Sequence, residues 1–275
     1  MSQPITGWEK HHRGHFDDIT EKYENVRPGY PSQLFADIFQ YATTTATPKA
    51  IEIGAGTGKA TPPFLNAGYN VTAVEIGTNM SAFLQKKFSG NNFNVITAPF
   101  EDAALEENTY DLIYAATAFH WVDAEIGCPK DFRLLKSGGA FALFRANMLL
   151  GCNQELNAEI QTFYEKHYNS HYKSSQRPVE KSHEELKQPA EIKRGFGFSD
   201  LGSYGFKDIT SKFYDTTRTF TADEFVTLLE TFSDHKQLPQ SNKVALFAGV
   251  KQAIQKHGNK HEINYIYQLY MGRKP

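Results

Sequence analysis

The chain has 275 residues, of which 40% are hydrophobic and 22% charged, and its formal net charge is −2. This length suits one large α/β domain or a core domain with a cap. The composition excludes a wholly disordered chain, and the lack of a basic excess disfavours a dedicated nucleic-acid binder. Two cysteines, Cys128 and Cys152, are too few for a disulfide framework or a structural zinc site. We therefore expect no metal.

The N-terminal residues predict where the protein works. They contain no apolar segment of the kind that marks a secretory signal. No window approaches the roughly 18 apolar residues that a membrane-spanning helix needs. We therefore expect a cytoplasmic protein, monomeric or homodimeric, that acts on neither a membrane nor a nucleic acid.

The first half of the chain alternates predicted helices and strands. Periodicity and turn residues predict helices over 30–42, over 60–67, from Thr78 onward and starting or kinking at Pro129, and strands over 49–53, 70–75, 93–96, 110–116 and 140–144. The last of these strands should follow a turn at Ser137-Gly138-Gly139. Such alternation implies right-handed βαβ units and a parallel sheet.

The second half of the chain has a different character. Its patterns predict a helix near 156–167, a polar excursion over 169–193 and a strand over 205–215. They then predict a capped helix from Thr221, a helix near 244–254 and a strand over 261–271 whose apolar residues alternate. We expect residues 1–146 to form the core with an N-terminal helix, residues 147–204 a cap, and residues 205–275 the rest of the core.

The most informative segment is Ile51-Glu52-Ile53-Gly54-Ala55-Gly56-Thr57-Gly58, where the first strand ends. Its G-x-G-x-G spacing differs from the G-x-G-x-x-G of dinucleotide sites, and Ala60 excludes a Walker A loop. Glu75 ends the next strand, 17 residues after Gly58. An acid there can accept hydrogen bonds from both ribose hydroxyls of an adenosine. A structural turn and a solvated glutamate are the alternative interpretation.

Several motifs together resemble the class I S-adenosylmethionine-dependent methyltransferases. The resemblance is to the methyltransferase type 11 group, which is related to ubiquinone-biosynthesis and trans-aconitate methyltransferases. It rests on the glycine segment, on Val74-Glu75, on Tyr110-Asp111-Leu112-Ile113 and on Leu135-Lys136-Ser137-Gly138-Gly139, in that order. It implies an α/β, Rossmann-like, doubly wound seven-stranded mixed sheet with an antiparallel last strand and a partly helical cap.

The resemblance also implies which residues bind the cofactor, S-adenosyl-L-methionine. They are Tyr23, Arg27, Gly54, Ala55, Gly56, Gly58, Glu75, Ile76, Met80, Phe100, Glu101 and Ala116. In this family a tyrosine and an arginine close over the methionine end, so Arg27 should pair with the cofactor carboxylate. Pro99 stands where many members have an aspartate, so we place the adenine contacts on Phe100 and Glu101.

The acceptor side is predicted from residues that follow the fourth and fifth strands. His120, in Phe119-His120-Trp121, either orients or deprotonates the acceptor, or shapes the pocket. Trp121 and Arg145 are candidate substrate-binding residues, with Arg145 able to clamp an anionic acceptor. The segment Phe232-Ser233-Asp234-His235 lines the acceptor pocket or ends a surface helix.

We therefore expect an enzyme that methylates a small molecule, with a carboxylic acid first among the candidates. The region from Thr221 to Pro239 loosely resembles trans-aconitate methyltransferases. Two alternatives stay open, namely a non-catalytic S-adenosylmethionine-binding protein and a methyltransferase of RNA or protein. The glycine spacing disfavours a nicotinamide-dependent oxidoreductase.

Overall fold

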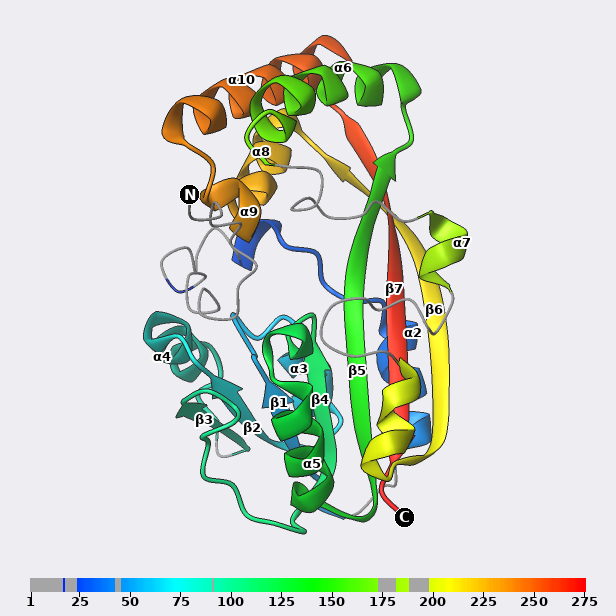
Figure 1. Cartoon of the computed structure of the whole chain (residues 1–275). Helices are drawn as coiled ribbons and strands as arrows, with labels where there is room; N and C mark the ends of the chain where they lie inside the picture. Colours follow the sequence, from blue (N-terminus) through cyan, green and yellow to red (C-terminus); the bar gives the residue numbers. More distant parts are fainter. Residues whose placement is uncertain (1–16, 18–23, 43–45, 91, 173–181, 188–197) are drawn as a thin grey trace, which may run out of the picture. The chain divides into compact units, whose positions relative to one another are not determined.

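The computed structural model describes residues 17, 24–42, 46–90, 92–172, 182–187 and 198–275. The strands are β1 (Lys49–Ile53), β2 (Asn70–Glu75), β3 (Phe93–Thr97), β4 (Tyr110–Ala116), β5 (Leu135–Gly151), β6 (Lys207–Phe220) and β7 (His261–Arg273). These described strands form one seven-stranded sheet in the order β3-β2-β1-β4-β5-β7-β6 (Figure 1). The sheet is mixed and Rossmann-like, which confirms the predicted fold class.

The strands β3, β2, β1, β4 and β5 pair in parallel. β4 is buried along nearly its whole length, as its apolar sequence requires for a central parallel strand covered on both faces. The order reverses beside β1, because β2 lies on one side of it and β4 on the other. Ligands of open α/β sheets bind at such a switch point, beyond the carboxyl ends of the strands.

β5 is longer than predicted, because Gly138 and Gly139 lie inside it rather than in a turn before it. Tyr110 pairs with Leu135 but Leu112 pairs with Ala140, so the glycines form a bulge. Gly138 has a φ of +79°, a backbone conformation that glycine adopts without strain. The prediction of a turn there was therefore wrong.

β7 runs antiparallel to β5, as predicted. Gly138 N donates to Lys274 O at 2.8 Å, and Cys152 N donates to Glu262 O at 2.8 Å. Residue numbers thus rise along β5 as they fall along β7. The alternation predicted for this last strand does not correspond to one buried face, since consecutive residues from Tyr265 to Gly272 are all buried. The polar residue Gln268 is buried among them.

One helix precedes β1, and the other helices described lie between the strands in the sequence. The helices are α2 (Ser32–Tyr41), α3 (Thr61–Asn66), α4 (Thr78–Lys87), the 3-10 helix η2 (Phe119–Trp121), α5 (Ala124–Leu134), α6 (Gln154–Tyr164), the π-helix η3 (Glu165–Asn169), α7 (His183–Leu186), the 3-10 helix η6 (Phe198–Tyr204), α8 (Ala222–Glu230), α9 (Ser233–Lys236) and α10 (Gln240–Lys256). α8 begins with the predicted capping box of Thr221 and Glu224.

Pro129 lies inside α5, which begins five residues earlier than its predicted start. The Asp123 side chain accepts a hydrogen bond from Glu125 N at 3.2 Å and caps the helix there. A cap satisfies a backbone donor that the first turn leaves unpaired. The cap, rather than the proline, therefore fixes the start of the helix.

The chain divides into two compact units. Unit 1 comprises residues 1–27, 148–182 and 215–265, and unit 2 comprises residues 28–147, 183–214 and 266–275. Each unit is built from three separate stretches of sequence. That residues 147–204 form a cap, with boundaries at 146/147 and 204/205, stays a prediction.

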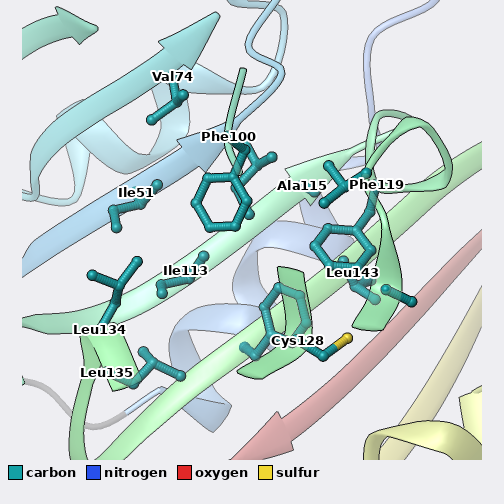
Figure 2. Packing of buried hydrophobic residues seen from close by; sticks show 14 of the residues in the cluster. Ile51, Val74, Phe100, Ile113, Ala115, Phe119, Cys128, Leu134, Leu135 and Leu143 are labelled. Atoms are coloured by element: carbon teal, nitrogen blue, oxygen red, sulfur yellow. The ribbon is translucent and has the colours of Figure 1, made fainter. Parts of the chain in front are cut away.

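Unit 2 has a large hydrophobic cluster around β1, β4 and β5. Figure 2 shows Ile51, Ile113 and Leu143 from these strands in one cluster with Cys128 of α5 and the rings of Phe100 and Phe119. Cys128 is fully buried. The cluster therefore packs along these strands and includes Phe100, one of the predicted cofactor residues.

Candidate functional site

The glycine segment forms a tight turn at the end of β1. Gly54, Gly56 and Gly58 all have positive φ angles, of +64°, +58° and +74°. At Gly54 an added Cβ would lie 2.7 Å from the Cβ of Ala118, in the loop after β4. At Gly58 it would lie 2.4 Å from the ring of Phe88. The first glycine thus lets two loops approach each other, and the third lets the turn pack beside α4.

Glu75 joins this turn to the end of β2. Its Oε2 accepts a hydrogen bond from Gly56 N at 2.7 Å, and its Oε1 accepts one from Gly77 N at 2.9 Å. The side chain is buried. Gly54 N also donates to Val74 O at 2.8 Å. The structure therefore brings the predicted glycines and the predicted acid together through direct hydrogen bonds.

The loop after β3 carries Phe100 and Glu101. The Lys130 ammonium holds this loop by donating to the carbonyl oxygens of Phe100 at 2.8 Å, Glu101 at 3.2 Å and Ala103 at 2.6 Å. The Phe100 ring is buried in the hydrophobic cluster (Figure 2). Glu101 Oε1 accepts from Asp123 N at 3.4 Å, which connects this loop to the start of α5. The adenine contacts of both residues stay a prediction.

The loop after β4 contains a strained residue that sequence reasoning missed. Thr117, directly after Ala116, has a φ of +54°, an unfavourable conformation for a β-branched residue. Its hydroxyl is 2.9 Å from the hydroxyl of Tyr30, and its N–H donates to Phe144 O at 2.7 Å. These bonds fix the direction of the loop that continues into His120. A tyrosine 87 residues away gives no signal in the sequence.

His120 and Trp121 lie side by side in η2, with ring centroids 5.1 Å apart. Both are partly buried. Trp121 N donates to Ala118 O at 3.0 Å, so the short helix is anchored by the same alanine that packs against Gly54. His120 and Trp121, both predicted to contact the acceptor, thus lie in the same loop as Ala118, which lies against Gly54.

Arg145 lies in β5 beside this loop. Ala146 N donates to Thr117 Oγ1 at 3.3 Å, and Phe144 O accepts from Thr117 N. Arg145 is the residue between these two anchors and is partly buried. Burial of Tyr270 raises the pKa of its hydroxyl, and the positive charge of Arg145 acts in the opposite direction. A cation is therefore held within β5, beside the loop that follows β4.

Glu52 is a second functional candidate that the motif alone did not single out. It is only 1% exposed and lies two residues before Gly54. Burial raises the pKa of its carboxyl to about 7, although hydrogen bonds from Thr61 and Tyr114 act in the opposite direction. A buried, ionisable group with a strongly shifted pKa beside a ligand site is a functional candidate.

The remaining predicted cofactor residues differ in what the structure shows. Met80 is buried in α4, and Ile76 is partly buried beside Glu75. Arg27 belongs to unit 1, where its Nε donates to Thr231 Oγ1 and its Nη2 to Thr231 O, each at 2.8 Å. Its guanidinium also covers the ring of Phe232 at 4.6 Å. The pairing of Arg27 with a cofactor carboxylate stays a prediction, and Tyr23 lies outside the described residues.

The segment Phe232-Ser233-Asp234-His235 is not the end of a surface helix, because Ser233, Asp234 and His235 are buried in unit 1. His235 Nδ1 is 3.1 Å from Asp234 Oδ1, and His235 Nε2 is 2.8 Å from the Tyr164 hydroxyl. Burial acts to raise the pKa of Asp234, but His235 and Tyr168 hold it below its usual value. The segment forms a paired polar network with α6 and η3.

Among the described residues, no three histidine, cysteine, aspartate or glutamate side chains are grouped so as to hold a metal ion. None of the helices described has the length and apolar character needed to cross a bilayer.

Comparisons with known proteins bear on the family and the fold of this chain. Residues 51–143 match a family model described as a methyltransferase domain. An uncharacterized methyltransferase of Schizosaccharomyces pombe is 24% identical over 86% of this chain and 85% of its own length. A structure described as a type II methyltransferase from Anaeromyxobacter dehalogenans covers 90% of this chain and 98% of that one, with 19% identity and a TM-score of 0.63.

A further structure of this fold contains the demethylated cofactor. It is phosphoethanolamine N-methyltransferase 2 of Haemonchus contortus with S-adenosylhomocysteine, at 18% identity and a TM-score of 0.53, covering 98% of this chain and 60% of that one. Residues 51–143 thus form a methyltransferase domain. Together with the methyltransferase relatives, this domain supports an enzyme that uses S-adenosylmethionine.

The residues present suit this cofactor. The glycine turn exposes backbone without side chains, and Glu75 offers a carboxylate at the same place. A carboxylate can accept about four hydrogen bonds. Glu75 already accepts two, from Gly56 N and Gly77 N, so it can accept two more from the ribose hydroxyls.

Proposed function

We propose that this methyltransferase acts on a small molecule that carries a carboxylate, with di- and tricarboxylic acids as the first candidates. The observation that supports this proposal is the position of Arg145 between the two β5 residues that bond Thr117. A guanidinium at that position can bind a carboxylate with two parallel hydrogen bonds. The loose resemblance to trans-aconitate methyltransferases points to the same chemical class.

The residues of unit 2 then have distinct tasks. The bound cofactor supplies an activated methyl group, so the protein contributes mainly alignment and a dry site. Gly54, Gly56 and Glu75 hold the ribose side, and Phe100 and Glu101 hold the adenine. Arg145 binds the acceptor carboxylate, and His120 orients it. A carboxylate acceptor has no proton to lose, so the transfer needs no base.

Replacing Arg145 by glutamine should raise the KM for the acceptor by roughly 10- to 100-fold, the usual loss for a charged hydrogen-bond pair of about 1.5–3 kcal/mol. Formation of S-adenosylhomocysteine should be measured with a panel of di- and tricarboxylic acids, including trans-aconitate, and with amines as a comparison. Arg133→Gln is the matched control, because Arg133 makes an exposed ion pair with Glu107. Equal turnover of acids by both variants would contradict the proposal.

Replacing His120 by alanine should leave cofactor affinity unchanged and lower kcat by less than about 100-fold, because an orienting histidine moves no proton. Calorimetry with S-adenosylhomocysteine and steady-state rates with the best acid acceptor test both parts. A loss of 10²- to 10⁴-fold that depends on pH would show general-base catalysis and would exclude a carboxylate as the acceptor. A large loss of cofactor affinity would place His120 in the cofactor site instead.

We further propose that the enzyme is cytoplasmic, acts on neither nucleic acid nor membrane, and works as a monomer or homodimer. The net charge of −2 supports the exclusion of nucleic acid and membrane, since nucleic acid and anionic lipid surfaces attract basic proteins. Residues 147–204 are proposed as the cap over the acceptor.

A further inference from the structure

Glu52 occupies a central position beneath the glycine turn. Its Oε2 accepts a hydrogen bond from Thr61 Oγ1 at 2.6 Å and another from the Tyr114 hydroxyl at 3.0 Å. Thr61 is the first residue of α3, and Tyr114 lies in β4, which pairs with β1. One buried carboxyl oxygen thus connects three elements that meet where the turn begins.

The charged and titratable groups around Glu52 come from each neighbouring element. Glu75, from β2, is a like charge that favours the protonated form of Glu52, whereas Lys87, from α4, favours the ionised form. Tyr114, from β4, and the uncharged Thr61, from α3, both donate to the carboxyl. Burial is the largest influence, and the pKa of Glu52 rises to about 7. Near neutral pH, Glu52 is therefore present in both protonation states.

The cofactor and its product differ in charge at the sulfur atom. S-adenosylmethionine contains a sulfonium cation, whereas the sulfur of S-adenosylhomocysteine is neutral. Glu52 responds to the charge of Glu75, the residue whose carboxylate is bonded to Gly56 in the turn. In a buried site such interactions are screened less than in water. A charge on a ligand held at the turn should therefore also change the proton affinity of Glu52.

We propose that Glu52 lets the glycine-turn site distinguish cationic S-adenosylmethionine from neutral S-adenosylhomocysteine, and that binding of the cation releases a proton from Glu52 to the solvent. The ionised carboxylate favours the cation, so the preference for cofactor over product increases as Glu52 ionises. The inference rests on the glycine turn being the cofactor site. In it Glu52 is a specificity-determining residue that acts through charge.

A purely structural role for Glu52 makes different predictions. A carboxyl that only ties β1, α3 and β4 together would affect stability and would weaken both ligands equally when removed. It would produce neither a change in their affinity ratio with pH nor a proton release specific to one ligand. These two quantities therefore separate discrimination by charge from simple support of the turn.

The test is calorimetric titration of the full chain with S-adenosylmethionine and with S-adenosylhomocysteine from pH 5.5 to 8.5, in buffers of different ionisation enthalpy. The ratio of the two dissociation constants should shift toward S-adenosylmethionine by several-fold as pH rises through about 7, since one pKa unit corresponds to a tenfold change in affinity. Near pH 7, S-adenosylmethionine should release a fraction of a proton, and S-adenosylhomocysteine close to none.

Two variants sharpen this test. Glu52→Gln should remove the pH dependence of the ratio. Tyr114→Phe keeps the ring that stacks on Phe64 at 3.8 Å but removes one donor to Glu52, so the midpoint of the pH dependence should move upward. Glu107→Gln, at an exposed carboxylate, should change neither quantity.

A ratio that is independent of pH in the wild type, or that changes with pH identically in Glu52→Gln, would overturn the proposal. An unshifted midpoint in Tyr114→Phe would overturn it as well, even if Glu52→Gln fails to fold. Failure of both ligands to bind at any pH would instead overturn the assignment of the glycine turn as the cofactor site.

Discussion

Replacement of Glu75 by alanine should weaken the binding of S-adenosylmethionine and S-adenosylhomocysteine by about 1–3 kcal/mol, the typical cost of losing a charged hydrogen-bond partner. The variant loses the contacts to the ribose and also the acceptor of Gly56 N and Gly77 N. Backbone donors left without a partner in a buried place are costly. We therefore expect the free energy of unfolding to fall together with the affinity.

Two measurements separate these effects. Calorimetry with S-adenosylhomocysteine gives the affinity, and urea unfolding without ligand gives the stability. Glu75→Gln keeps one oxygen acceptor of the same size, so it should retain more stability than Glu75→Ala while still losing affinity. An unchanged affinity in a folded Glu75→Ala protein would mean that the ribose binds elsewhere.

Asp131 should destabilise the protein at neutral pH, so replacing it by valine should raise the free energy of unfolding by about 1–3 kcal/mol, the cost of an unsatisfied buried polar group. The side chain is 0% exposed in α5. Neither carboxyl oxygen has a hydrogen-bond partner among the described residues. Burial raises the pKa of Asp131 well above its usual value, and Lys130 only partly opposes this. Valine has a similar shape without the polar atoms.

The sign of the pH dependence follows from this shift. Folded Asp131 keeps its proton at a pH where the unfolded chain, with a pKa near 3.8, has lost it. Stability contributed by this residue is therefore lost progressively as pH rises above about 4. The advantage of Asp131→Val should be larger at pH 8 than at pH 5, as measured by urea unfolding at both values.

Asp111 provides the matched control for this experiment. It is also buried, at 4% exposure, but its oxygens accept from Lys49 N and from Lys136 Nζ, each at 2.8 Å. Asp111→Val should therefore destabilise the protein, because it leaves both donors without their acceptor. If both aspartate variants lose stability, Asp131 has a partner in solution.

The sequence predicted the parallel half of the sheet closely. β1, β2 and β4 have the expected bounds, because their short length and flanking turn residues favour buried strands over helices. The glycine turn and Glu75 were both assigned to the cofactor, and the structure joins them through the hydrogen bond from Gly56 N. The spacing of the motif carries this information, since strands that are neighbours in the sequence pair in the sheet.

Other features could not be predicted, for identifiable reasons. Gly138 and Gly139 indicated a turn, but tertiary pairing with β4 extends β5 through them as a bulge. Asp131 gives no local sign that it faces the core, because helix periodicity tolerates one polar residue on an apolar face. Thr117 and Tyr30 meet only in three dimensions, so neither position carries a motif. The network around His235 likewise joins segments more than 60 residues apart.

The way each unit is assembled also bears on how the protein is made. Unit 2 includes residues 266–275, in which Lys274 exchanges backbone hydrogen bonds with Gly138 and Gly139. A ribosome synthesises these residues more than 200 residues after the glycine turn. Unit 2 therefore cannot complete its sheet before residues 266–275 have been synthesised. Contacts between such distant residues also slow folding.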